Sequence, residues 1–393
     1  MSQDSVVIVS AARTPMGGMM GAFAGLSSVE LGSAAVREAV SRASLSNDDV
    51  DELLFGCVLP ANLGQAPARQ VALGADLATS TPCTTVNKVC GSGMKTVMIA
   101  HDQILAGSSD IAVAGGLEGM TGAPHMLPSG RAGLRFGHGQ VNDHMLTDGL
   151  EDVYTKNAMG VLAQATADEN SLTREEMDDY AIESLRRANE AIEKGHMEAE
   201  IAPVTVKSRK GDTVIAIDEQ PGNARPDKIP SLRPAFKKDG TLTAANSSSI
   251  SDGAAALVLM KESEAQKRGL QPLARIVAHA SHAEEPKDFA VAPAGAMKKA
   301  LEKSNWSTDE IDLFEINEAF AAVSILGARS IGAPLDKVNI NGGACALGHP
   351  LGASGARIIV TLLHALKRTG GKKGLASLCI GGGEATAITV EML

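Results

Sequence analysis

A chain of 393 residues with 44% hydrophobic side chains is long enough for two or three domains with sizeable cores. Its formal net charge of −10, from 36 basic and 46 acidic side chains, argues against nucleic acid or an anionic membrane as the main partner. An anionic small molecule stays possible, because local clusters of basic side chains decide that kind of binding.

The five cysteines are an odd number and include no C-x-x-C pair. This favours reduced thiols in a cytosol over a disulfide framework or a zinc site. No apolar stretch reaches the length of a membrane span, and the N-terminus lacks the pattern of a secretory signal. We therefore expect a soluble, cytoplasmic protein without a metal site.

Apolar strands alternate with amphipathic helices in the first third of the chain, as in α/β folds. The predicted strands cover residues 6–10, 53–57 and 111–114, and the predicted helices cover 29–41, 67–77 and 94–105. The continuous apolar run 111–114 is typical of a parallel strand that is covered on both faces.

One cysteine of this region, Cys90, stands in a glycine frame, within the stretch Asn-Lys-Val-Cys-Gly-Ser-Gly-Met at 87–94. The glycines allow a tight turn beside the sulfur. A thiol at the start of a helix also faces the positive end of the helix dipole, which favours the thiolate. The frame alone is consistent with a nucleophile and equally with a buried structural cysteine.

The composition changes after about residue 122. Residues 123–149 are rich in Gly, His, Pro and Met, which predicts a long loop of the kind used in function or assembly. A capping box at 173–176 opens a helix that runs to Lys194 and ends at Gly195.

A locally basic region follows between residues 207 and 238. It contains Lys207, Arg209, Lys210, Arg225, Lys228, Arg233, Lys237 and Lys238. These side chains are either scattered over the surface or form a binding site for a phosphate-bearing ligand.

An internal repeat is the most informative feature of the sequence. The pattern of residues 46–56 returns at 307–317, and Gly91-Ser92-Gly93 is answered by Ala353-Ser354-Gly355 at nearly the same offset. Each copy continues into a helix and an apolar strand that ends in glycines. We therefore predict two similar βαβαβ halves, with the segment 123–247 inserted in the first.

Corresponding loops of two packed halves should converge, which brings together the stretches 90–93, 317–320, 342–352 and 379–383. A lone histidine between Gly and Pro is more often structural, but opposite a cysteine His349 is the base that makes a thiolate. A second thiol, Cys379, is suited to moving a proton. Glycine-rich loops supply N–H groups for a developing oxyanion.

These motifs resemble the thiolase family, over essentially the whole chain and in the family's order. They are Val-Cys-Gly-Ser-Gly at 89–93, Asn-Glu-Ala-Phe at 317–320, Gly-His-Pro-Leu-Gly at 348–352 and Cys-Ile-Gly-Gly-Gly at 379–383. The resemblance implies a duplicated, layered α-β-α-β-α fold with an inserted loop domain. Within the family the chain is most similar to short biosynthetic-type members. The implied reaction is the reversible condensation of two acetyl-CoA to acetoacetyl-CoA and CoA, or thiolysis of a 3-ketoacyl-CoA.

The resemblance also implies roles for five residues of the converging loops. Cys90 takes the acyl group as a thioester, and His349 is the base that activates it. Cys379 removes the α-proton of the second acyl-CoA. Asn317 holds a water that stabilises the enolate oxygen together with His349, and the N–H groups of Cys90 and Gly381 form the oxyanion hole.

Coenzyme A thioesters are the implied substrates, with no permanently bound cofactor. The implied contacts to them are Ser248, Leu150, Met159, Ala235, Phe236, Ala244, Ala319 and Phe320. Two positions depart from the family pattern. Ala158 stands where the family often has a histidine, and Gln220-Pro221-Gly222 replace a usual arginine. These departures bear on acyl-chain preference and on adenine contacts.

The resemblance divides the chain into three units. Residues 1–122 and 248–272 form the first thiolase half, 123–247 the loop domain for CoA binding and subunit contacts, and 273–393 the second half. The expected assembly is a homotetramer, with no nucleic acid or membrane partner.

Two other functions compete with this interpretation. A β-ketoacyl synthase relative shares a duplicated fold and a nucleophilic cysteine, but such sites typically lack a second catalytic cysteine such as Cys379. In a non-enzymatic acyl-CoA carrier we would expect at least one of the four principal residues to be replaced. All four are present: Cys90, Asn317, His349 and Cys379. The sequence does not fix the direction of flux.

Overall fold

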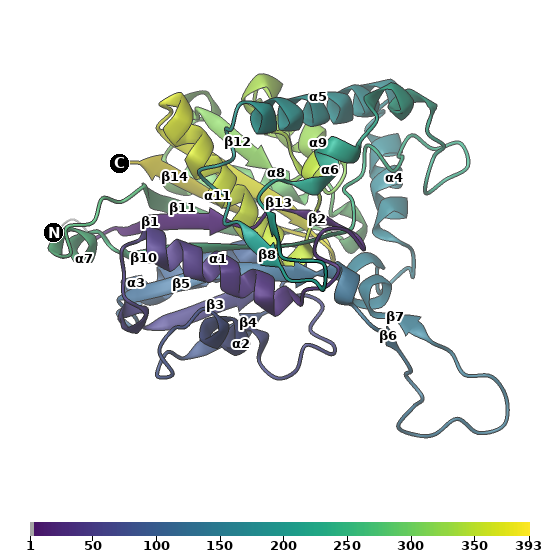
Figure 1. Cartoon of the computed structure of the whole chain (residues 1–393). Coiled ribbons are helices and arrows are strands. Elements are labelled where there is room, and N and C mark those ends of the chain that lie inside the picture. Colours follow the sequence, from purple (N-terminus) through teal and green to yellow (C-terminus); the bar gives the residue numbers. More distant parts are fainter. Residues whose placement is uncertain (1–3) are drawn as a thin grey trace.

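The computed structural model describes residues 4–393 and is built around one large mixed β-sheet (Figure 1). The first three residues of the predicted first unit lie outside this range. The strands of the sheet are β1 Val6–Arg13, β2 Gly17–Gly18, β3 Glu52–Gly56, β4 Cys83–Val86, β5 Ile111–Gly119, β10 Ser251–Lys261, β11 Ala274–Ala283, β12 Leu313–Ile316, β13 Lys373–Ile380 and β14 Glu384–Met392. Their spatial order is β12-β13-β14-β11-β1-β10-β5-β3-β4, and β2 pairs with β10.

The sheet consists of two similar halves that meet at β1 and β11. In the first half β3 is parallel to β4 and β5, and in the second β12 is parallel to β13. The strands β10 and β14 pair antiparallel with their neighbours. Each half therefore ends in an antiparallel strand that the predicted βαβαβ unit lacked. In the first half the long insertion before β10 concealed this pairing.

Helices cover the sheet in layers. Helices α1 Ser28–Arg42 and α2 Pro67–Gly74 pack on the outer face of the first half, and α8 Ala292–Ser304 and α9 Ala321–Ile331 on that of the second. Helices α3 Ser92–Ala106 and α11 Leu351–Thr369 lie between the halves and share one apolar core with strands of both. The predicted duplicated α-β-α-β-α fold is confirmed.

The two central helices approach one another through small residues. A Cβ atom on Gly93 would lie 2.8 Å from the backbone nitrogen of Ala356, and one on Gly355 would lie 2.4 Å from that of Met94. Both glycines belong to the repeat, so the duplicated motif allows the close packing of α3 against α11.

The repeat also recurs in local detail. Ser46 and Ser307 each cap a short 3-10 helix, Asn47–Asp49 and Thr308–Glu310, with reciprocal hydrogen bonds. Where β4 lies beside β3, the second half has an isolated parallel bridge between Phe314 and Val338.

Three predicted element ends shift by three residues or more, and the largest shift is that of β5, which runs to Gly119 and not to the predicted residue 114. Strand β1 passes the predicted end at residue 10 because Ala11, Ala12 and Arg13 continue the ladder with β10. Helix α2 ends at Gly74, before the predicted Leu77.

The segment between β5 and β10 carries short elements and two longer helices, and its long β6–β7 loop projects from the body (Figure 1). Its elements include β6 His125–Met126, β7 Asn142–Asp143, α4 Met159–Glu169, α5 Arg174–Glu193, β8 Val204–Val206, β9 Thr213–Ile215 and α6 Glu219–Asn223. Outside it lie α7 Glu262–Lys267 and α10 Ala344–Leu347. The exact borders of the three units stay predictions. Within residues 4–393, no helix combines the length and apolar character needed to cross a bilayer.

Candidate active site

The predicted stretches meet around a cavity of about 290 Å³ between the two halves and the inserted segment. Cys90, His349, Cys379 and Gly381 all line it. Asn317 lies directly behind them, with its amide nitrogen 3.5 Å from Nε2 of His349. The structure thus brings together five residues from four separate stretches of the chain.

A strained turn presents Cys90 to this cavity. Val89 has φ +45°, a conformation that is rare for a β-branched residue and costs of order 1–3 kcal/mol. The turn is held from both sides, because the Val89 N–H donates to Oδ1 of Asn87 at 2.9 Å and its carbonyl accepts from Oγ of Ser92 at 2.6 Å. Such maintained strain directly before a thiol indicates a functional constraint on its position.

Cys90 is nearly buried, and burial raises the pKa of its thiol to about 11. The N–H groups of Gly381 and of Cys90 itself oppose this rise, as does the location before α3, but they do not overcome it. Burial therefore outweighs the lowering of the Cys90 pKa that the helix N-terminus predicts. The thiol is neutral and needs a base to become a nucleophile.

His349 has the properties of that base. It lies between α10 and α11, and burial, with a smaller contribution from Arg357, lowers its pKa to about 3. Its Nδ1 lies 2.6 Å from Oγ of Ser354, which donates its own hydrogen to the Pro350 carbonyl at 2.9 Å. Ser354 therefore accepts the Nδ1 proton, and Nε2 keeps its lone pair toward the cavity side.

Asn317 and Cys379 complete the polar part of the site. Asn317 follows β12, is buried, and its Oδ1 has no hydrogen-bond partner among residues 4–393. Cys379 lies near the end of β13, where burial and the neighbouring Cys90 raise its pKa well above the ordinary value. A buried amide oxygen without a partner is typical of a position that holds water or ligand.

A buried carboxylate beneath the site was not found from the sequence. Glu118 of β5 accepts N–H bonds from Val58 and Leu59 at 3.1 Å each and from Gly352 at 2.8 Å, and burial raises its pKa to about 7. It joins a loop of the first half to the start of α11. The available signal was one acid inside the otherwise apolar strand 111–119. Ser354 was recognised only as part of the repeat.

Most predicted coenzyme A contacts lie around the same cavity. Leu150, Met159, Phe236, Ser248, Ala319 and Phe320 line it, as does Ala158, the first departure from the family pattern. Ala244 instead lines a second cavity of about 280 Å³, together with Gln220 of the second departure. Ala235 is exposed and lines neither cavity, and its N–H donates to the carbonyl of Leu242 at 2.9 Å.

The second cavity adjoins the first, since Ser249 lines both. Arg225 and Lys228 of the predicted basic region line the second cavity. Lys237 of the same region instead pairs with Asp168 at 2.7 Å on the surface. Some basic side chains of this region therefore lie on the surface, and others line the second cavity.

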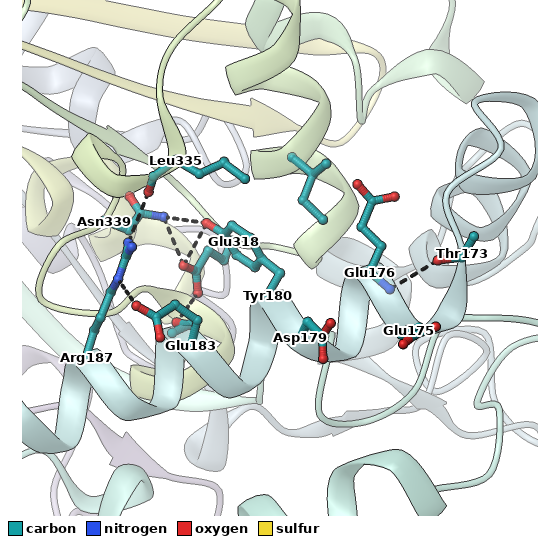
Figure 2. A pocket seen from close by; sticks show the side chains of 12 residues that line it. Thr173, Glu175, Glu176, Asp179, Tyr180, Glu183, Arg187, Glu318, Leu335 and Asn339 are labelled. Atoms are coloured by element: carbon teal, nitrogen blue, oxygen red, sulfur yellow. Dashed lines mark hydrogen bonds and ion pairs between the residues drawn. The ribbon is translucent and has the colours of Figure 1, made fainter.

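A separate acidic cleft of about 500 Å³ lies beside α5 and contains neither thiol nor His349 (Figure 2). At its inner end the buried carboxylate of Glu318 accepts from Tyr180 at 3.1 Å, Ser184 at 2.8 Å, Asn339 at 2.9 Å and the Cys345 N–H at 2.9 Å. Glu318 thus fixes the loop after Asn317 to α5, which is a structural task.

Comparison with known proteins agrees with the sequence motifs. The thiolase N-terminal domain matches residues 6–263, and the thiolase C-terminal domain matches residues 270–392. Acetyl-CoA acetyltransferase IB of Candida tropicalis is 47% identical over 100% of this chain and 98% of its own length.

Two solved structures resemble the whole chain. The Acat5 thiolase from Ascaris suum, determined in complex with coenzyme A, is 42% identical with a TM-score of 0.94, covering 99% of this chain and 100% of that one. The acetyl-CoA acetyltransferase of Bacillus anthracis is 41% identical with a TM-score of 0.97, covering 100% and 99%.

Proposed function

The chain belongs to the thiolase family, and from this premise we propose that it catalyses the reversible condensation of two acetyl-CoA to acetoacetyl-CoA and CoA. The observation that carries this proposal is the meeting of Cys90, His349 and Cys379 at one cavity. A neutral thiol and a neutral imidazole that line the same cavity are the resting state that base-assisted acyl transfer requires.

In the first half-reaction Nε2 of His349 removes the proton of Cys90, and the sulfur attacks the thioester carbon of acetyl-CoA. The oxyanion of the tetrahedral intermediate accepts the N–H groups of Cys90 and Gly381, both of which already face the Cys90 sulfur. One such donor typically lowers the barrier by about 3–4 kcal/mol. CoA leaves as a thiol with the proton that His349 returns. Because one thioester is exchanged for another, the step is nearly balanced.

In the second half-reaction Cys379, which is a thiol at rest, first passes its proton to Nε2 of His349, and the resulting thiolate removes an α-proton from a second acetyl-CoA. A thioester α-proton is only weakly acidic, so the base must act together with stabilisation of the enolate oxygen. A water on Asn317, together with the proton now carried by Nε2 of His349, supplies this stabilisation, and the orphaned Oδ1 of Asn317 supports a water there. The enolate carbon then attacks the acetyl group, the Cys90 thiolate leaves, and His349 returns its proton to that sulfur.

The pantetheine arm runs past Ser248 and Ser249, from the first cavity toward the second. Arg225 and Lys228 then receive the phosphates, since guanidinium and ammonium groups are the usual phosphate partners in proteins. Ala235 lines neither cavity, so its contact with the arm stays a prediction.

We also propose a cytoplasmic homotetramer, in which the β6–β7 loop contacts another copy. The loop exposes Leu127, Leu134, Phe136 and Val141, an apolar surface that a partner would cover. The five free cysteines support a reducing compartment. Light scattering measures the assembly, and Phe136→Asp should reduce the molar mass.

The test of function is thiolysis of acetoacetyl-CoA by CoA, followed by loss of the enolate absorbance. We expect turnover with acetoacetyl-CoA and a thiolysis rate that changes stepwise with chain length across longer 3-ketoacyl-CoAs. A folded protein that cleaves none of these substrates would overturn the proposed activity.

A further inference from the structure

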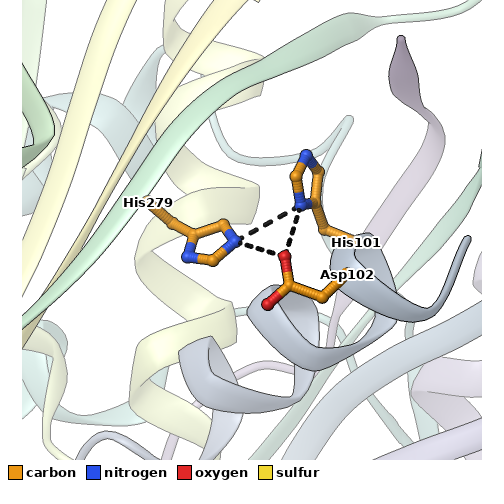
Figure 3. A group of neighbouring side chains, drawn as sticks. All are labelled: His101, Asp102 and His279. Carbon is orange, nitrogen blue, oxygen red and sulfur yellow. Dashed lines mark hydrogen bonds and ion pairs between the residues drawn. The ribbon is translucent and has the colours of Figure 1, made fainter. Parts of the chain in front are cut away.

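Two histidines and an aspartate that no step of the reaction uses turn their polar atoms toward one another (Figure 3). His101 and Asp102 lie in the second half of α3, and His279 lies on β11. The cluster is about 15 Å along α3 from the end that carries Cys90. It joins the central helix of the first half to the first strand of the second.

The three facing atoms form a compact triangle. Nε2 of His279 is 2.9 Å from Oδ1 of Asp102 and 3.3 Å from Nδ1 of His101, and that Nδ1 is 3.0 Å from the same Oδ1. Metal ligands at about 2.1 Å are separated by about 3.0 Å in cis octahedral positions and by about 3.4 Å in a tetrahedron. The observed edges span this range. A point about 2.1 Å from all three atoms lies about 1.1 Å off their plane.

The protonation of the cluster also suits a cation. Burial lowers the pKa of His279, although Asp102 opposes this. A neutral ring with its proton on Nδ1 presents the lone pair of Nε2 to a cation, which then replaces the hydrogen bond between this Nε2 and Asp102. Burial raises the pKa of Asp102, but the hydrogen bonds from both imidazoles lower it more, and the carboxylate stays ionised. The neighbouring cation Lys303 donates from its ammonium to the main-chain carbonyl of His279 at 3.0 Å.

We propose that His101, Asp102 and His279 bind one divalent transition-metal ion of the zinc class, which ties α3 to β11. Two imidazoles and one carboxylate are a donor set for zinc, cobalt or nickel, whereas calcium and magnesium prefer oxygen ligands. Water completes the coordination, because Asp102 faces solvent. The ion is structural, since it holds the two halves together at the end of α3 remote from the thiol.

Cobalt(II) alone is the probe that distinguishes this site from the cysteines. Binding through nitrogen and oxygen gives visible d–d bands, whereas thiolate ligands add intense near-ultraviolet charge transfer. We expect one cobalt per chain without charge transfer, displacement by zinc, and a rise in the melting temperature on metal addition. His279→Ala and Asp102→Asn should weaken binding by at least about 100-fold, because loss of even an outer-shell partner costs 10–100-fold.

His138→Ala is the matched control, since it removes an exposed histidine outside the cluster. Asp102→Asn retains the side chain's shape, so it separates lost binding from lost folding, and circular dichroism checks both variants. Equal cobalt binding by wild type and both cluster variants overturns the proposal. So does wild-type protein that takes up no cobalt, because the three groups are then a hydrogen-bonded cluster only.

Discussion

Replacing Ser354 with alanine tests whether one hydrogen bond sets the tautomer of the catalytic base. Ser354 Oγ is 2.6 Å from Nδ1 of His349 and is completely buried. It touches neither thiol and does not line the substrate cavity. Its removal should therefore alter the chemistry of His349 and leave substrate binding unchanged.

The magnitude follows from the burial of the donor. A buried N–H left without an acceptor costs about 1–3 kcal/mol, which disfavours the tautomer with the proton on Nδ1 by about 5- to 150-fold. That tautomer is the one whose Nε2 accepts the Cys90 proton. Acylation of Cys90 by acetyl-CoA should slow by a factor in this range in Ser354→Ala.

Single-turnover acylation, quenched in acid and read by mass spectrometry, gives the rate, and titration with CoA gives the affinity. Ser330→Ala is the matched control, because this serine also bonds to a carbonyl of its own helix, that of Gly327 at 2.7 Å, but faces no histidine. If Ser354→Ala acylates as fast as Ser330→Ala, the tautomer assignment is wrong. A loss of CoA affinity equal to the loss of rate would show a distorted cavity instead.

Three further predictions concern the other residues of the site. Cys379→Ala should still acetylate Cys90 but lose condensation and the exchange of α-hydrogen for deuterium; unchanged exchange would exclude Cys379 as the carbon base. Burial lowers the His349 pKa from its ordinary 6.5 to about 3, so the stability that this contributes is present above pH 6.5 and is lost as pH falls toward 3. Urea unfolding of wild type should therefore lose about 2 kcal/mol more than His349→Gln between pH 7 and pH 5, and parallel losses would refute the shift. Ala158 lines the acyl end of the cavity, so Ala158→His should reduce the ratio of kcat/KM for 3-ketohexanoyl-CoA to that for acetoacetyl-CoA. A hydrogen bond and a buried methylene group each change the binding free energy by about 1 kcal/mol. The kcat/KM ratio should therefore change about five-fold, and an unchanged ratio would contradict this prediction.

The duplicated fold and the meeting of the four stretches were predictable because the internal repeat can be recognised in the sequence. Two packed copies of one unit must bring their equivalent loops together, and Cys90 and His349 lie in equivalent loops of the two copies. The antiparallel strand β10 was harder to place, because more than a hundred residues separate it from β5, its partner.

Protonation states were not predictable from the sequence. The helix N-terminus beside Cys90 favours a thiolate, but the burial that outweighs it depends on packing by both halves. His101 and His279 are 178 positions apart and belong to no spacing motif, so only the fold brings them together.

The central claim is that Cys90 carries the acyl group between the two half-reactions. The most direct measurement is incubation with isotopically labelled acetyl-CoA, an acid quench and peptide mapping by mass spectrometry. We predict one labelled acetyl group per active chain, on Cys90, which is lost when unlabelled CoA is added before the quench. Label on another residue, or an active enzyme that retains none, would contradict the account.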